Sequence, residues 1–126
     1  MNLQFSVYGL GTTLFWSGSN PGLDACIHEA VERYGINVLD TAEMYGDGRS
    51  EEALGRAIRD IPREKLFLVD KILPDNADER HFKQSLHQSL RRLGTDYFDL
   101  YLLHWRETAD LAFMVSAMES AVKEGL

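Results

Sequence analysis

The feature that most constrains the fold is a fourfold alternation between short extended apolar segments and longer amphipathic ones. Apolar runs of strand length lie at about residues 5–10, 36–40, 66–71 and 98–103. After each run, apolar residues recur three or four positions apart, which is the spacing of an amphipathic helix. Strands joined through helices pair in parallel with right-handed crossovers. The sequence therefore predicts an α/β fold of four βα units, (βα)4, in a single domain over residues 1–126.

Capping signals predict where the helices begin and end. The expected starts are Ser50, Asn76 with Glu79 three residues on, and about Thr108, and the expected ends are Gly35, Pro62, Gly94 and Gly125. The apolar faces expected to pack on the sheet contain Leu23, Ile27, Val31 and Tyr34, then Leu54, Ala57, Ile58 and Ile61, then Phe82, Leu86 and Leu90, and finally Leu111, Val115, Met118 and Val122.

Two architectures fit this alternation, and periodicity alone does not separate them. One is an open doubly wound sheet, and the other is part of a (β/α)8 TIM barrel. The first predicted loop, "GLGTTLFWSG", holds Gly9 and Gly11 but has no third glycine at the offset of a GxGxxG motif. A dinucleotide-binding Rossmann unit is therefore weakly supported.

Charge and composition exclude several classes of function. The net charge is −7 and no basic cluster interrupts it, which argues against nucleic acid as a partner. No apolar run approaches the ~20 residues that span a bilayer, and the N-terminus does not resemble a signal peptide. The one cysteine, Cys26, fits a reducing compartment, so we expect a cytoplasmic location without membrane contact. We predict that Cys26 is a small core residue on the helical face of Leu23 and Ala30.

Polar side chains stand where successive predicted strands end. Asp40 ends the second strand with Tyr45 in the loop behind it, Lys71 ends the third, and His104 follows the fourth with Trp105 next to it. The intervals of 31 and 33 residues each equal about one βα unit. Because the carboxyl ends of parallel strands share one edge, where sites of α/β folds are built, these side chains should lie together.

These residue types form a coherent site for carbonyl reduction. A nearby ammonium stabilises a phenolate and so makes a phenol a stronger acid, while a carboxylate keeps the ammonium charged and oriented. A neutral imidazole can donate a hydrogen bond to a carbonyl oxygen, so the set can protonate an oxygen that gains negative charge. Each residue alone also has an ordinary structural explanation, as a turn, packing, solvated or core residue. Their combination at matching strand ends is what indicates a site.

Metal chemistry has less support from the sequence. The four histidines show neither HxH nor HExxH spacing, so we predict no metal site. A metal-dependent hydrolase barrel is therefore a weak third hypothesis beside the two developed below.

At these residues the chain resembles a known family. "GINVLDTAEMYGDGRSEEALGRAI" and "SLRRLGTDYFDLYLLHW" are similar to signatures of the aldo-keto reductases, (β/α)8-barrel enzymes that reduce carbonyls with NADPH. "LFLVDKILPDNADER" resembles the strand that carries their catalytic lysine, and "GLGTT" their first loop. The sequence of these stretches is most similar to bacterial members of the family. The resemblance implies a TIM-barrel fold and a small-molecule aldehyde or ketone as substrate.

The resemblance also implies a role for each matched residue. Tyr45 would be the general acid, Lys71 would make it acidic, Asp40 would pair with Lys71, and His104 would orient the carbonyl. Gly11, Thr12, Thr13 and Asp40 would contact the cofactor, and Tyr45, His104 and Trp105 would line the substrate pocket. Asp70 departs from the Ser or Thr usual before the lysine, and strand alternation points it away from Lys71. Thr13 stands at a position where an aromatic residue is common in the family.

The most serious departure is length. The chain stops after four units, whereas the resemblance implies eight, and the absent units would carry most of the cofactor site. We therefore expect a truncated half-barrel that is weak or inactive alone and that forms a homo-oligomer or pairs with the missing C-terminal half, because open edges and apolar faces favour association. The alternative hypothesis is a non-catalytic half-barrel, a binding or assembly module that keeps the four residues only by descent.

Overall fold

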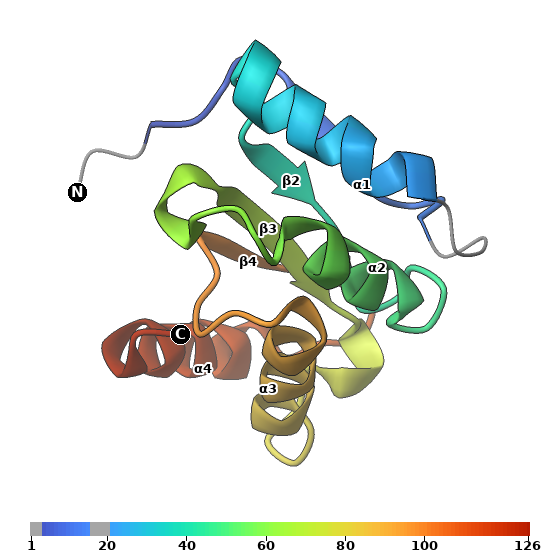
Figure 1. Cartoon of the computed structure of the whole chain (residues 1–126). Coiled ribbons are helices and arrows are strands. Elements are labelled where there is room, and N and C mark those ends of the chain that lie inside the picture. Colours follow the sequence, from blue (N-terminus) through green and yellow to red (C-terminus); the bar gives the residue numbers. More distant parts are fainter. Residues whose placement is uncertain (1–3, 16–20) are drawn as a thin grey trace.

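The computed structural model describes residues 4–15 and 21–126 and contains a four-stranded parallel sheet. The strands are β1 (Gly9–Gly11), β2 (Val38–Asp40), β3 (Phe67–Ile72) and β4 (Leu100–Leu103). They lie in the order β1-β2-β3-β4, and every neighbouring pair is parallel. The predicted βα repeat is therefore confirmed, and each strand lies beside the next strand of the chain (Figure 1).

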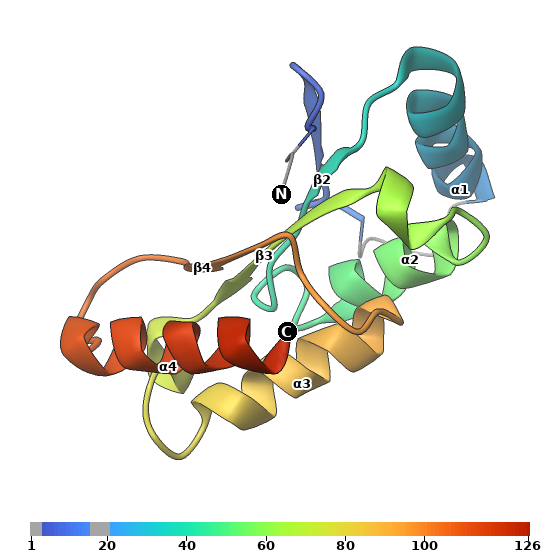
Figure 2. The ribbon, with the colours of Figure 1, turned by 90° about the vertical axis from the view of Figure 1, so that its left-hand side faces the viewer.

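Helices connect these strands and follow the last one. The α-helices are α1 (Pro21–His28), α2 (Arg49–Ile58), α3 (Phe82–Leu93) and α4 (Leu111–Glu124). Shorter helical turns are η1 (Glu29–Arg33), η2 (Arg63–Lys65) and η3 (Pro74–Asn76). Figure 2 shows the helices along one face of the curved sheet, while the opposite face carries no helix formed by residues 4–15 or 21–126.

The core lies between the sheet and the helices. Alternation sends Leu39, Leu68 and Ile72 from the strands into this layer, where they meet Leu54 of α2 and Leu86 of α3, and all five are fully buried. The other face of the sheet leaves β4 side chains such as Leu100 and Leu102 exposed. One sheet face is thus packed and the other is open.

The first strand is shorter than predicted. It covers Gly9–Gly11 instead of residues 5–10, and Phe5, Val7 and Tyr8 are exposed. The preceding segment is held by side chains: Ser6 N–H donates to Asn37 Oδ1 at 2.8 Å, and Ser6 Oγ accepts from Asn37 N–H at 3.0 Å. These bonds take the place of ladder bonds, so the strand begins later than the apolar pattern predicts.

Helix α2 starts near Ser50 as predicted, but the predicted cap residues of α2 and α3 are wrong because both are bonded elsewhere. Helix α2 begins after Gly48, whose φ of 82° requires a glycine, and the Ser50 hydroxyl donates to the Thr12 carbonyl at 2.8 Å. Before α3, Asn76 donates to Glu43, and Asp78 accepts from the backbone of the last residues before the helix. The predicted stop at Gly94, with φ 68°, is confirmed.

Cys26 is exposed, so the prediction that it is a core residue is wrong. Helix α1 passes into the π-helical turn Glu29–Arg33, which holds more residues per turn than an α-helix. A face counted at 3.6 residues per turn therefore loses its phase between Cys26 and Ala30. Ile27 and Val31 are buried as predicted, whereas Tyr34 at the end of that face is exposed.

Helix α4 packs with a different face from the one predicted. Met114 and Ala121 are its buried residues, while Leu111, Val115 and Val122 are exposed. Asp110 is its N-cap, with Oδ1 accepting from the N–H groups of residues 112 and 113. The exposed stripe and β4 line a broad apolar depression beside the free edge of the sheet. The helix has two apolar stripes, and only one of them meets the core.

Two close contacts tie neighbouring units together. Arg63 donates to Thr95 Oγ1, to the carbonyls of Leu66 and Tyr97, and to Asp99 Oδ2 at 2.7 Å. Asp99 Oδ2 also accepts from Leu68 N–H, so this clasp joins the starts of β3 and β4. Helices α2 and α3 touch at Gly55, where an added Cβ would lie 2.4 Å from the Arg92 carbonyl oxygen.

Candidate functional site

Asp40 and Lys71 meet on the open face of the sheet at its carboxyl edge. Asp40 pairs with Val69 in the β2–β3 ladder, so Lys71 stands two residues further along on the same face. Lys71 Nζ lies 2.7 Å from Asp40 Oδ1 and donates to the Thr41 carbonyl at 2.8 Å. The Lys71 side chain is 14% exposed and that of Asp40 is 37% exposed, so the ammonium is largely shielded from water while the carboxylate stays in contact with it.

Tyr45 turns back over this ion pair. Its loop leaves β2 and tightens where Tyr45 N–H donates to the Ala42 carbonyl at 3.0 Å. Lys71 Nζ lies 5.3 Å from the centroid of the Tyr45 ring, which is a cation–π distance. The Tyr45 ring also meets the His104 ring edge to face, with centroids 5.8 Å apart. The four residues predicted from strand ends are therefore brought into one cluster.

His104 follows β4 and has an unusual environment. Its backbone N–H donates to the Ile72 carbonyl at 2.9 Å, which fixes the residue beside the end of β3. Burial and the positive charge of Lys71 lower its pKa, against smaller opposing effects of Asp40 and Glu43. Its Nδ1 atom is buried without a hydrogen-bond partner among the residues described. Both effects, burial and the Lys71 charge, favour the neutral form of the imidazole.

Trp105 lies next to this cluster. Its ring is tilted against that of His104 with centroids 4.9 Å apart, and its Nε1 donates to Glu107 Oε2 at 3.0 Å. The side chain is 43% exposed, so one face of the indole is open to a small molecule at the mouth.

The first loop divides into exposed and buried residues. Gly11 lies opposite Asp40 in the β1–β2 ladder and is exposed, as is Thr13. Thr12 is fully buried, its N–H donates to the Asp40 carbonyl at 3.0 Å, and its own carbonyl accepts from Ser50. Thr12 thus fixes the loop, while Gly11 and Thr13 face outward beside the cluster.

Buried carboxylates behind the cluster were not predicted as part of the site. Glu43, Glu51 and Asp70 lie between the sheet and the helices, and Glu51 and Asp70 are fully buried. Glu51 stands in the first turn of α2 and pairs with Arg92 at 2.8 Å. Asp70 points away from Lys71 as predicted. The only sequence signal for its burial was a charge in the middle of the apolar run "LFLVDKI".

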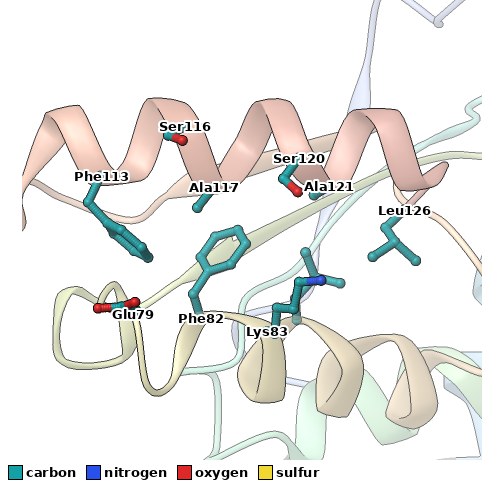
Figure 3. A pocket seen from close by; sticks show the side chains of 10 residues that line it. Glu79, Phe82, Lys83, Phe113, Ser116, Ala117, Ser120, Ala121 and Leu126 are labelled. Carbon is teal, nitrogen blue, oxygen red and sulfur yellow. The ribbon is translucent and has the colours of Figure 1, made fainter.

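A separate hollow of about 220 Å³ lies between α3 and α4. Phe82 and Phe113 approach each other across it edge to face, with Lys83 and Glu79 nearby (Figure 3). None of the four clustered residues lines it, so it is distinct from the candidate site. Within residues 4–15 and 21–126, no helix is long and apolar enough to cross a bilayer, and no group of three or more His, Cys, Asp or Glu side chains could hold a metal ion.

Comparison with known proteins gives a consistent result. A sequence profile of the Aldo/keto reductase family matches residues 9–126. Methylglyoxal reductase YeaE of Escherichia coli K12 is 46% identical over 101 residues, which is 80% of this chain and 35% of that protein. Methylglyoxal reductase DkgA of Salmonella typhimurium is 37% identical over 123 residues, or 94% of this chain and 41% of its own length.

A solved structure extends the match to three dimensions. An aldo-keto reductase from Klebsiella pneumoniae in complex with NADPH superposes with a TM-score of 0.89 at 41% identity. The match covers 96% of this chain and 43% of that one. The chain thus spans less than half the length of these relatives, and its sheet corresponds to part of a (β/α)8 barrel, as predicted.

Proposed function

The chain belongs to the aldo/keto reductase family, and we propose that it carries the proton-transfer half of an NADPH-dependent oxidoreductase that reduces an aldehyde or ketone to an alcohol. The relatives named above are methylglyoxal reductases, and a solved family member is complexed with NADPH. A small aldehyde is accordingly the proposed substrate class. A cytoplasmic site of action, compatible with the lone cysteine, is part of the same proposal.

The observation that carries this proposal is the contact of Lys71 with both Asp40 and Tyr45. A phenol donates a proton readily when a cation lies close to it, and the carboxylate of Asp40 holds that cation in place. Tyr45 then gives its proton to the carbonyl oxygen as negative charge develops there. Neutral His104 orients that oxygen by donating a hydrogen bond, and Trp105 lines the mouth.

Bound NADPH would supply the hydride for this reaction. Residues Gly11, Thr13 and Asp40 would contact the cofactor, with Thr12 holding their loop from behind. An added Cβ at Gly11 would meet no atom within 4 Å, so a flat ring can approach the backbone at this point. These residues fit one side of a cofactor site.

Titration of the 126-residue chain with NADPH, followed by cofactor fluorescence, tests the proposal. Saturable binding supports it, and methylglyoxal then heads the panel of aldehydes for a turnover assay. No binding at millimolar NADPH would favour the alternative function, a non-catalytic half-barrel that retains the four residues by descent. Gly11→Val is the matched variant, since its side chain would occupy the open approach to the backbone without disturbing the core.

Tyr45→Phe separates the chemical role of the phenol from its packing role. The substitution removes one hydroxyl and keeps the ring that contacts His104 and Lys71. We expect the variant to bind NADPH as the wild type does and to lose reduction by two or more orders of magnitude, roughly the contribution of a general acid. Retained turnover in this variant would refute the assignment of Tyr45.

We also propose that a second copy of the chain completes the barrel. The four-stranded sheet has two free edges, β1 and β4, and its open face exposes apolar side chains of β4. Two copies joined edge to edge would supply the eight strands of the family barrel. A light-scattering mass of two chains supports this arrangement, whereas the mass of one chain at high concentration would contradict it.

A further inference from the structure

Glu43 is a buried acid inside the loop that carries Tyr45. It lies three residues after Asp40 and two before Tyr45, and it is only 7% exposed. A carboxylate is seldom buried unless its oxygens find hydrogen-bond donors. The partners of Glu43 therefore show why this loop keeps a charge among the apolar residues behind the site.

The Glu43 carboxylate joins three donors from the next βα unit. Oε1 accepts from Leu73 N–H at 2.5 Å and from Asn76 Nδ2 at 3.0 Å, and Oε2 accepts from the Ser85 hydroxyl. Leu73 and Asn76 belong to the connection that follows Lys71, and Ser85 lies in α3. One side chain thus holds both the segment after β3 and the helix that covers it.

The backbone of Glu43 strengthens the same link. Its N–H donates to the Lys71 carbonyl at 3.3 Å, and its carbonyl accepts from Gly48 N–H at 2.9 Å, which closes the loop around Tyr45. Glu43 is therefore bonded to β3 through its backbone and to the residues after β3 through its side chain. Rotation of this short loop would have to break both sets of bonds.

We propose that Glu43 is the positioning residue that sets Tyr45 over Lys71 and against His104. The inference rests on the proposed function, because it assigns a role in holding the proton donor of that reaction. The side-chain hydrogen bonds of Glu43 described above go to Leu73, Asn76 and Ser85, which lie outside the cluster, so it acts through the loop. Its removal should let Tyr45 drift from the cation and from the imidazole while the sheet remains intact.

Substitution of Glu43 by glutamine or by alanine separates the loss of its hydrogen bonds from the loss of its acidic group. In Glu43→Gln the amide oxygen can keep both bonds made by Oε1, and the amide nitrogen can donate to the Ser85 hydroxyl, which rotates to accept. In Glu43→Ala all three donors lose their partner. Glu51→Ala is the matched control, since Glu51 is equally buried and bonded to Arg92 but lies in α2 beyond the loop.

The readout is the NMR signal of the His104 ring, which senses the aromatic ring of Tyr45 at 5.8 Å. A His104→Gln spectrum assigns the signal among the four histidines, and Tyr45→Leu gives its position without the tyrosine ring. We expect Glu43→Ala to move the His104 signal most of the way to its Tyr45→Leu position. Glu43→Gln and Glu51→Ala should leave it close to the wild-type position.

Two results would overturn the proposal. In the first, Glu43→Ala and Glu51→Ala lose the same amount of unfolding free energy, but the His104 signal of Glu43→Ala does not move. Glu43 would then have a purely structural role. The other is an equal shift in both alanine variants. If Glu43→Ala does not fold, Asn76→Ala and Ser85→Ala each remove one partner, and the proposal requires each to produce a smaller shift in the same direction.

Turnover kinetics provide a second test of the role of Glu43 that is independent of the NMR result. If the wild type reduces an aldehyde, Glu43→Ala should lower kcat at least tenfold with little change in KM, and Glu43→Gln should recover most of it. If the wild type neither binds NADPH nor turns over, the proposed function fails, and the His104 signal still decides whether Glu43 holds Tyr45 in place.

Discussion

Replacement of Asp70 by asparagine should stabilise the protein at neutral pH and flatten the pH dependence of its stability. Asp70 is fully buried on the helix-facing side of β3, where its Oδ1 accepts from Lys71 N–H at 2.8 Å. Its Oδ2 and the Oε1 of Glu51 are both buried, and neither finds a donor among the residues described. A proton on Asp70 would supply the missing hydrogen bond between the two carboxyls.

The direction of the pH dependence of stability follows from the pKa of Asp70. Burial raises it well above the ordinary value, and the negative charges of Glu51 and Glu43 add to that effect. Above pH ~4 an unfolded chain releases this proton while the folded protein keeps it. The unfolded state then binds fewer protons, so the free energy of unfolding falls as pH rises, until the pH passes the raised pKa of the folded state.

The size of the stability change follows from the same linkage between proton binding and folding. Each pH unit within that window shifts the unfolding equilibrium constant by about tenfold, so the penalty accumulates from the ordinary pKa of a carboxyl up to the raised pKa of Asp70. Asparagine cannot ionise, keeps an acceptor for Lys71 N–H, and offers its amide to Glu51. The variant should therefore avoid this penalty, and its advantage over the wild type should grow with pH.

The assay is equilibrium urea unfolding, followed by circular dichroism at several pH values from 5 to 8. Other groups titrate in this range, including His104, whose lowered pKa makes stability fall as pH drops. The difference between the wild type and Asp70→Asn isolates Asp70. Asp75→Asn, at an exposed carboxylate, is the control and should give a curve parallel to that of the wild type. Parallel curves for Asp70→Asn as well would refute a buried protonated acid.

Three further predictions follow from contacts described above. Gly55→Ala should lower the unfolding free energy in urea titrations, because overpacking against the Arg92 carbonyl costs about 1–3 kcal/mol and outweighs a helix-propensity gain of up to ~1 kcal/mol; a more stable variant would contradict the close approach. Arg63→Lys should lose about 1–3 kcal/mol by the same measurement, since an ammonium cannot reproduce the four directed bonds of the clasp, and an unchanged midpoint would show that the clasp contributes little. His104 should titrate by NMR below the ordinary imidazole range near ~6.5, and Lys71→Met should raise its pKa by removing a nearby positive charge; a fall in that variant would reverse the electrostatic argument.

Much of the sheet and its site was predictable because strand order and strand ends follow from chain order in a βα repeat. Asp40, Lys71 and His104 came together from a simple rule, namely that parallel strands present their carboxyl ends at one edge. Tyr45 was expected near them as a residue of the loop behind Asp40, and the structure shows its ring against that of His104. Their catalytic roles stay predictions until variants are measured.

Other features depended on partners far away in the sequence. Asn76 has the preferences of a helix cap, but Glu43, 33 residues earlier, binds its amide. Ser50 likewise binds the Thr12 carbonyl across 38 residues instead of capping its own helix. Local propensity gives no information on such competition. The exposure of Cys26 had another cause, because a π-helical turn changes the helical phase without an evident sequence signal.

The order of the strands has a consequence for how the chain acquires its structure. Each strand pairs only with the strands next to it in the chain, and the Arg63–Asp99 clasp closes a loop of 36 residues, about one βα unit. Contacts of such limited sequence separation reduce the loop entropy that must be lost before packing begins. Every unit can therefore dock on the edge left by the one before it as the polypeptide leaves the ribosome. Synthesis from the N-terminus and growth of the sheet from β1 toward β4 run in the same direction.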